Sequence, residues 1–167
     1  ETLIGKAGET AVTKESKLEY KSQEVDRLAL DLGSLQQAIR SLESAIGVFD
    51  HKLADSQTTP AEMNVIRAGV IQNFESTYEL CWKYMKRWLE EQIGAAYVDG
   101  VPRRELFRLA AENRLLTDVD RWMDFHQARN RTSHTYDTAI AEIVLRESLA
   151  FLPAAQEFLH RLEQRNA

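Results

Sequence analysis

The sequence contains few of the residues that cross-link or interrupt a chain. Its 167 residues include one cysteine, Cys81, which excludes an internal disulfide and favours a reducing compartment. Seven scattered glycines form no Gly-rich phosphate-binding loop. No apolar run approaches the roughly 18 residues of a membrane span. Because the amino terminus also lacks a basic segment followed by an apolar stretch, we expect a cytoplasmic protein with no membrane partner.

The chain has no overall excess of basic residues, which is the usual property of a nucleic-acid-binding domain. Its formal net charge is -5. Residues 80–134 are the exception, because they carry ten Lys and Arg side chains against eight carboxylates. Any site for a polyanion is therefore expected to be local and to lie in this part of the chain.

Periodicity divides the chain into an extension and one domain. Residues 1–25 are polar and have no sustained period, so we interpret them as a polar N-terminal extension. The domain is expected over residues 26–167. It opens with a heptad pattern, which predicts a helix of an antiparallel bundle or, alternatively, a coiled-coil dimer arm. The residues of this pattern are Leu28, Leu32, Leu35, Ile39, Leu42, Ile46, Phe49 and Leu53.

Further helices follow, separated by turn and cap residues. "SQTTP" (56–60) predicts a loop before a helix over 61–93, and "AAYVD" between Gly94 and Gly100 predicts another loop. A short helix is expected through about residue 113, and a helix capped by Thr117 or Asp118 follows it. The last helix begins at Asp137 or Thr138, and Pro153 is expected to bend it. Its predicted apolar positions are Ile140, Ile143, Val144, Leu149, Leu152, Leu159 and Leu162.

No strand pattern is present in the sequence, so the predicted fold class is all-α. The predicted architecture is an antiparallel four-helix up-and-down bundle with one extra short helix. Cys81 lies within the apolar stripe of the second helix and is expected in the core.

The segment "ARNRTSHTYD" (128–137) admits two interpretations, a helix end with a cap or a chemical site. Arg129 and His134 are five residues apart, which places them about 140° apart around a regular helix. They can converge only if the helix ends between them, or if two copies of the chain meet. Since Thr132, Ser133 and Thr135 are common types at helix ends, we expect a turn here.

An arginine beside a histidine can support cleavage of RNA without a metal. Imidazole can take the proton of the ribose 2′-OH, and guanidinium can hold the phosphate through two hydrogen bonds. Asn130 and Ser133 could orient the phosphate or the imidazole, and Arg131 could add a phosphate contact. No paired metal-ligand spacing appears near His126 or His134, so we expect neither a metal site nor a cofactor. Spacing alone leaves a cap with surface charge as the open alternative.

The segment "RNRTSHTYD" resembles the signature of HEPN domains, which consists of Arg, four residues, His, any residue and Tyr. Three longer segments resemble the nucleotidyltransferase substrate-binding branch of that family, which includes the HepT-like toxins. They are "RAGVIQNFESTYELCWKYMKRWLEE" (67–91), "RELFRLAAENRLL" (104–116) and "WMDFHQARNRTSHTYD" (122–137). Together they occur in the order and spacing of the branch, over roughly residues 30–160.

This resemblance implies a homodimeric helical bundle that acts as the ribonuclease toxin of a toxin–antitoxin pair. The implied partner and antitoxin is a small MNT-type nucleotidyltransferase. By position, Arg129 and His134 would be the catalytic pair, and Tyr136 would be the hydroxyl that the antitoxin modifies with AMP. The branch also implies an alternative, a non-catalytic subunit that presents substrate to a nucleotidyltransferase. A purely structural bundle is the third possibility.

Overall fold

The computed structural model describes residues 29–166, which form α-helices and one 3-10 turn and include no strand. The predicted all-α class is therefore confirmed. The polar extension predicted at residues 1–25 lies outside the described residues, as do residues 26–28 and 167. None of the helices in the described part is both long and apolar enough to span a membrane.

Helix α2 (Gly33–Ala54) follows the heptad pattern over most of its length. Four pattern residues are fully or almost fully buried: Leu35, Ile39, Leu42 and Phe49. The pattern is wrong at its end, because Leu53 is 59% exposed. The first residue of the heptad pattern, Leu28, lies outside the described part of the chain.

Helix α3 (Pro60–Ile93) begins where the hydroxyl-rich loop predicts it. The Thr59 side chain accepts a hydrogen bond from the Glu62 backbone N–H, and the Glu62 carboxylate accepts one from the Thr59 N–H. This reciprocal cap satisfies two N–H groups that a helix start leaves unpaired. The helix ends at Gly94, whose φ of 97° suits glycine far better than any other residue.

The segment predicted as the loop "AAYVD" instead contains the short helix α4 (Ala95–Val98). The prediction failed here because Val98 is buried, and a single helical turn brings its side chain onto the core. Helix α5 (Arg103–Glu112) then covers one end of α3, with Leu106, Phe107 and Ala110 buried. Leu109 of the same helix is half-buried.

Helix α6 (Val119–Asn130) starts at the predicted cap, since the Asp118 carboxylate accepts a hydrogen bond from the Arg121 N–H. The 3-10 turn η1 (Thr132–His134) leads to α7 (Thr138–Arg165), which continues through Pro153. In α7 only two of the predicted apolar residues, Val144 and Leu162, are fully buried. The buried stripe is completed by Ser148, Phe151, Ala155 and Phe158, and the remaining predicted residues flank it half-buried.

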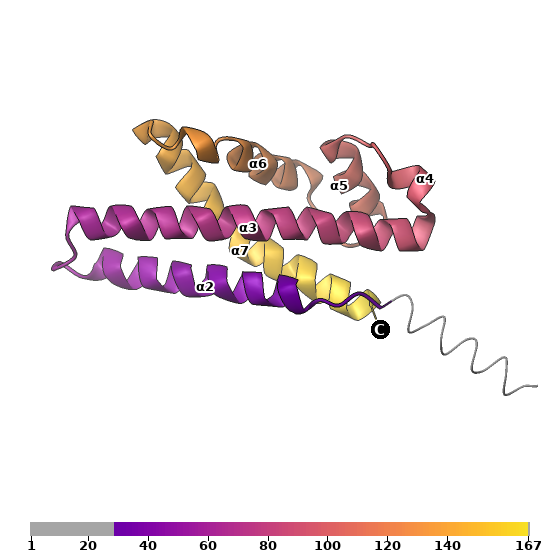
Figure 1. Cartoon of the computed structure of the whole chain (residues 1–167), viewed down its shortest axis with the longest axis horizontal. Coiled ribbons are helices and arrows are strands. Elements are labelled where there is room, and N and C mark those ends of the chain that lie inside the picture. The colour runs from indigo at the N-terminus through magenta and orange to yellow at the C-terminus, as the bar shows by residue number, and fades with distance from the viewer. Residues whose placement is uncertain (1–28, 167) are drawn as a thin grey trace, which may run out of the picture.

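Figure 1 shows α2 and α3 side by side and antiparallel, with α7 running obliquely behind them. Helices α5 and α6 lie along the other side of α3. The two ends of the described chain meet, because Asn166 exchanges hydrogen bonds of 2.7 and 2.8 Å with the backbone of Leu30. Helix α3 thus packs against every other α-helix of residues 29–166.

The aromatic ring of Phe151 in α7 lies at the centre of the core and is fully buried. Its centroid is 5.2 Å from that of Phe74 in α3. It is also 5.5 Å from the ring of Trp122 and 5.0 Å from that of Phe125, both in α6. Edge-to-face pairs of this kind add to the stabilisation that burial itself provides.

Replacing Phe151 with Ala should lower the free energy of unfolding by about 3–5 kcal/mol, because it removes a buried ring and leaves a cavity among three helices. Denaturant unfolding monitored by circular dichroism measures this change. Val65→Ala, at a position 74% exposed, is the control and should change stability by less than about 0.5 kcal/mol. A loss below about 1 kcal/mol in Phe151→Ala would show that this ring does not organise the core.

Candidate functional site

The helix end predicted between Arg129 and His134 is present. Helix α6 stops at Asn130, and the next residues form the turn η1. The Thr132 hydroxyl donates to the Arg129 carbonyl at 2.9 Å, and the Thr135 hydroxyl donates to the Thr132 carbonyl at 3.2 Å. Asp137 then caps α7 by accepting from the N–H groups of the second and third residues after it. Side chains thus replace the helix hydrogen bonds through this turn.

His134 and Tyr136 lie exposed on the outside of the turn. Their ring centroids are 6.1 Å apart in an edge-to-face arrangement, and Tyr136 is 86% exposed. A tyrosine usually buries most of its ring, so a phenol group presented in this way is accessible to a large partner. The turn therefore offers an imidazole and a phenol hydroxyl side by side.

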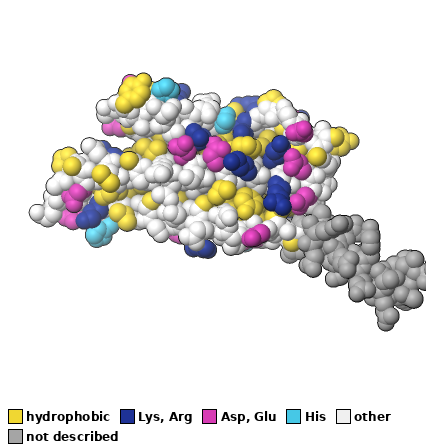
Figure 2. All heavy atoms as spheres, in the orientation of Figure 1, with side chains coloured by type: hydrophobic (Ala, Val, Ile, Leu, Met, Phe, Trp, Pro, Cys, Tyr) yellow, Lys and Arg dark blue, Asp and Glu magenta, His cyan; other side chains and the backbone are white. Residues whose placement is uncertain are grey.

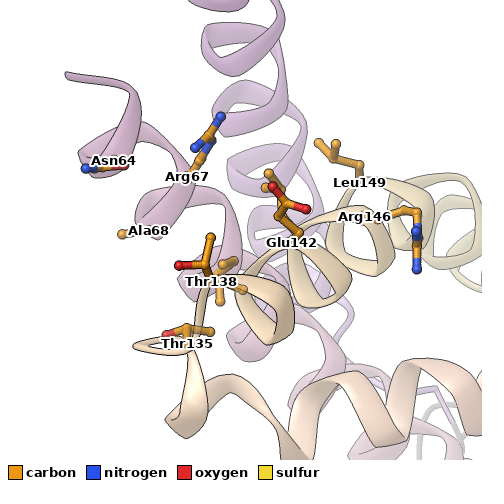
Figure 3. Close-up of a pocket in the computed structure, with 11 residues that line it drawn as sticks. Asn64, Arg67, Ala68, Thr135, Thr138, Glu142, Arg146 and Leu149 are labelled. Atoms are coloured by element: carbon orange, nitrogen blue, oxygen red, sulfur yellow. The ribbon is translucent and has the colours of Figure 1, made fainter. Parts of the chain in front are cut away.

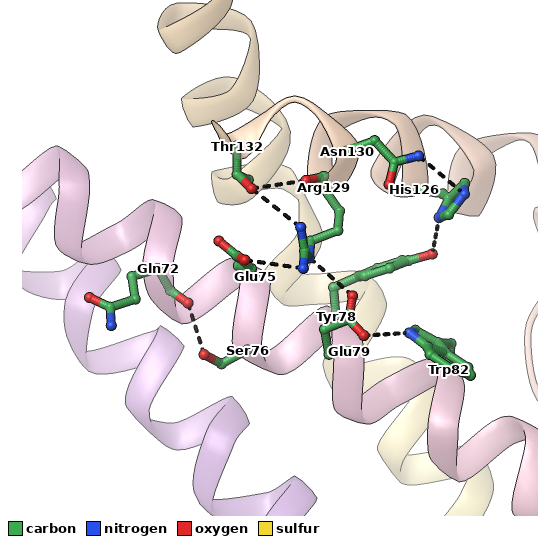
Figure 4. Close-up of polar contacts among 10 residues, drawn as sticks. All are labelled: Gln72, Glu75, Ser76, Tyr78, Glu79, Trp82, His126, Arg129, Asn130 and Thr132. Carbon is green, nitrogen blue, oxygen red and sulfur yellow. Dashed lines mark hydrogen bonds and ion pairs between the residues drawn. The ribbon is translucent and has the colours of Figure 1, made fainter. Parts of the chain in front are cut away.

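Arg129 points the other way, toward α3 (Figure 4). Its Nε donates to Glu79 Oε1 at 3.0 Å, and its Nη2 lies 3.1 Å from Glu75 Oε1. Its Nη1 makes a longer contact of 3.4 Å with the Thr132 hydroxyl. The side chain is only 28% exposed, so it sits at the edge of the helix interface.

The fold of a single chain therefore does not join the two predicted catalytic residues. Among residues 29–166, no hydrogen bond or ring contact links Arg129 to His134. The helix end frees His134 from the helix surface, but Arg129 remains tied to α3. The single chain thus provides no direct contact between these two side chains, and the pairing of two copies is the second route by which they could converge.

The predicted supporting residues occupy different environments. The Asn130 side-chain amide lies 3.3 Å from His126 Nε2, and His126 Nδ1 is 2.7 Å from the Tyr78 hydroxyl. Arg131 and Ser133 are exposed, and their side chains make no hydrogen bond or ion pair within the described chain. Asn130 thus belongs to a helix–helix network, while the other two are available to solvent.

Burial and the nearby Arg103 lower the pKa of the His126 imidazole below its ordinary value. Burial likewise raises the pKa of the Tyr78 phenol and of the Cys81 thiol, and Cys81 lies in the core as predicted. No cluster of three or more His, Cys, Asp or Glu residues in the described chain is arranged to hold a metal ion.

Glu75 and Glu79, which hold Arg129, are site residues that the sequence did not predict. Their spacing of four residues places both carboxylates on one face of α3, and this was the only signal in the sequence. Nothing in the sequence indicated that Arg129, about fifty residues away, lies opposite them. Trp82 also belongs here, because its indole N–H donates to Glu79 Oε2 at 3.0 Å.

A groove of about 600 Å³ lies next to the turn, between the first halves of α3 and α7 (Figure 3). Thr135 of the turn lines one end of it. Arg67 and Arg146 also line it, and neither has a carboxylate within 4 Å among residues 29–166. The groove is large enough for a small organic ligand or a few linked groups of a polymer.

A second cavity of about 330 Å³ lies beyond Arg129, between α3 and α5. Arg103 lines it with its guanidinium 3.5 Å from the centre of the Trp82 ring. Eight residues of α3 line the groove, hold Arg129 or line this cavity. At about 100° per residue, all of them except Arg67 fall within about 80° of arc. These seven are Asn64, Ala68, Ile71, Glu75, Glu79, Trp82 and Lys86.

The charges around this face are mixed. Figure 2 shows Lys and Arg side chains next to Asp and Glu side chains across the view, without a uniformly basic area. The ion pairs of Arg129 and those of Lys86 with Glu90 and Asp99 belong to this pattern. The local excess of basic residues in the sequence is therefore largely neutralised by neighbouring carboxylates.

The all-helical fold of residues 29–166 is shared with a known family of proteins. The family model described as "Nucleotidyltransferase substrate binding protein like" matches residues 30–164, and the chain belongs to this family. The match covers all of the helices described above except the last residue of α7.

The chain is 34% identical over 139 residues to a protein from Haemophilus influenzae named "Probable ribonuclease HepT". That alignment covers 82% of this chain and 94% of the relative. A solved structure of HI0074 from Haemophilus influenzae, described as revealing the fold of a substrate-binding domain of a nucleotidyltransferase, matches with a TM-score of 0.75 and 30% identity. It covers 80% of this chain and is itself covered completely.

A crystal structure of a protein from Thermus thermophilus is also similar, with a TM-score of 0.55 and 28% identity. The match covers 72% of this chain and 98% of the other.

The lowered pKa of His126 predicts a pH dependence of stability. The unfolded chain binds this proton more readily than the folded chain, so the free energy of unfolding falls as pH is lowered through the ordinary histidine pKa of about 6.5. Denaturant unfolding at about pH 7.5 and about pH 5 should show a smaller loss in His126→Gln than in the wild type.

His160→Gln provides the control, because that imidazole is exposed on α7, and it should retain the wild-type loss. Equal losses in the wild type and in His126→Gln would mean that the buried imidazole does not contribute to acid sensitivity.

Proposed function

We propose that this chain is a metal-independent ribonuclease, the toxin of a toxin–antitoxin pair whose antitoxin is a nucleotidyltransferase. The observation that carries the proposal is the exposed pair of His134 and Tyr136 after the end of α6, which holds Arg129, in a chain similar to a protein named as a probable ribonuclease. The turn brings an imidazole to the surface, where a ribose hydroxyl can reach it.

In the proposed reaction His134 removes the proton from a ribose 2′-OH. The 2′ oxygen attacks the adjacent phosphorus, the bond from phosphorus to the 5′ oxygen breaks, and that oxygen takes up a proton as it leaves. Arg129 stabilises the charge that builds on the phosphate oxygens. The products are a 2′,3′-cyclic phosphate and a 5′-hydroxyl, so the reaction needs no water and no metal.

The proposed active form is a homodimer in which two copies of the turn face a shared cleft. This arrangement would let Arg129 of one copy and His134 of the other meet on one phosphate. The groove between α3 and α7, with Arg67 and Arg146, is a suitable path for the flanking RNA because it leads from the turn along α3. Asn130, Arg131 and Ser133 are proposed to support the site.

Substitution of either catalytic residue tests the proposal. Arg129→Ala and His134→Ala should each lower RNA cleavage by at least about 100-fold, since one removes the phosphate ligand and the other the base. His160→Ala, which removes another exposed histidine, should cut at the wild-type rate. Cleavage should persist in a chelator and cease when the RNA is replaced by DNA.

Full activity in both alanine variants would overturn this proposal. The second candidate, a non-catalytic substrate-binding subunit, is favoured by the family description and by the HI0074 match. It would be supported if the wild-type protein formed a stable complex with a nucleotidyltransferase but cut no RNA.

Tyr136 is the proposed target of the antitoxin. The tyrosine oxygen would attack the α-phosphate of ATP, forming a phosphodiester with AMP and releasing pyrophosphate. The added phosphate and adenine would then repel and block RNA beside His134. Because the phenol is 86% exposed, it can enter the active site of another enzyme without unfolding of the turn.

Co-expression with the nucleotidyltransferase should therefore add one AMP to the protein, detected by mass spectrometry of the intact chain and of its peptides. Tyr136→Phe should remain unmodified and should stay toxic in the presence of the partner. Tyr97→Phe is the matched control, because Tyr97 is 72% exposed and lies outside the turn. Unchanged modification of Tyr136→Phe would show that the acceptor is another residue.

A further inference from the structure

Arg129 is the one residue of the proposed catalytic pair that the fold holds in place, and two carboxylates of α3 hold it. We propose that Glu75 and Glu79 are positioning residues that aim the Arg129 guanidinium at the scissile phosphate. This inference rests on the proposed ribonuclease function. It adds to the site two residues, Glu75 and Glu79, that act through Arg129 and do not contact the RNA.

The hydrogen bonds of the Arg129 guanidinium show how many of its N–H groups remain available for a phosphate. A guanidinium has five N–H groups, one on Nε and two on each Nη. Glu79 takes the Nε–H, Glu75 takes one Nη2–H and Thr132 faces one Nη1–H. One N–H therefore remains on each Nη atom, and phosphate oxygens can accept hydrogen bonds from both.

Glu79 is itself fixed, so it can serve as a rigid support. Its Oε2 accepts from the Trp82 indole at 3.0 Å while its Oε1 holds Arg129. The Arg103 guanidinium in turn stacks on the Trp82 ring, 3.5 Å from its centre. The chain of contacts from Arg103 through Trp82 and Glu79 to Arg129 joins α5, α3 and α6. Figure 4 shows its part from Trp82 to Arg129.

The two carboxylates also have a second effect: their charge weakens RNA binding, whereas their positioning of Arg129 favours catalysis. Two negative charges beside one guanidinium leave this cluster with a net negative charge, which disfavours the approach of a polyanion. Removal of a carboxylate should therefore strengthen RNA binding, because the repulsion of the phosphates decreases. It should also slow catalysis, because Arg129 is no longer held in one orientation. A positioning role thus predicts that kcat falls while KM does not rise.

The test compares Glu79→Ala, which removes the contact, with Glu79→Gln, which keeps an oxygen for the Arg129 Nε–H but loses the charge. Under single-turnover and steady-state conditions, Glu79→Ala should lower kcat up to about 100-fold and Glu79→Gln less, with KM unchanged or lower in both. Glu75→Ala should act in the same direction. A kcat that is unchanged or higher in Glu79→Ala would overturn the proposal, and a higher kcat would show that the carboxylates inhibit Arg129.

Glu147→Ala is the matched control. Glu147 binds Arg121, another arginine of α6, at 2.6 Å and is 16% exposed on its side chain, but it lies outside the Arg129 cluster. Its loss should lower the free energy of unfolding while kcat stays at the wild-type value. If Glu79→Ala and Glu147→Ala lower kcat equally, Glu79 has only a structural role and the proposal fails.

A measurement without RNA keeps this inference separate from the proposed function. In nitrogen-15 NMR of the full chain, the Arg129 Nε–H should be protected from solvent exchange in the wild type and exchange rapidly in Glu79→Ala. Rapid exchange in the wild type would overturn the proposed positioning. If the wild type cuts no RNA but the Nε–H is protected as expected, the ribonuclease proposal fails and the positioning of Arg129 stands.

Discussion

The fold depends on the packing of one aromatic ring, Phe151, against rings from two other helices. Its contacts with Phe74 of α3 and with Trp122 and Phe125 of α6 fix the distances among α3, α6 and α7. Because α6 is held against α3 in this way, the last turn of α6 reaches the polar face of α3. The position of the proposed site is thus a consequence of the aromatic core, although no core residue takes part in it.

At the edge of this core, ion pairs rather than apolar packing hold α6 against α3. Arg129 is mostly removed from water, and a partly desolvated guanidinium is stable only when carboxylates or other acceptors compensate for the lost hydration. Glu75 and Glu79 provide that compensation, and they also restrict the guanidinium to one orientation. The same pairs that stabilise the α3–α6 interface can therefore prepare a phosphate-binding group.

The turn after α6 has the opposite character. His134 and Tyr136 are exposed and are supported by local hydrogen bonds of Thr132, Thr135 and Asp137 rather than by core packing. An anchored arginine and an exposed histidine–tyrosine pair suit different tasks, binding a phosphate at a fixed point and reaching a partner molecule. In the proposed homodimer, the exposed pair of one copy would approach the anchored arginine of the other.

The sequence by itself determined the elements whose causes are local. Helical periodicity, the Thr59, Asp118 and Asp137 caps and the helix end before Thr132 all follow from residues within a few positions of one another. Only the tertiary structure decided which face of α7 is buried, that Leu53 is exposed, and that Glu79 meets Arg129. These outcomes depend on which helices lie opposite each other, and a pattern within one helix contains no information about its neighbours.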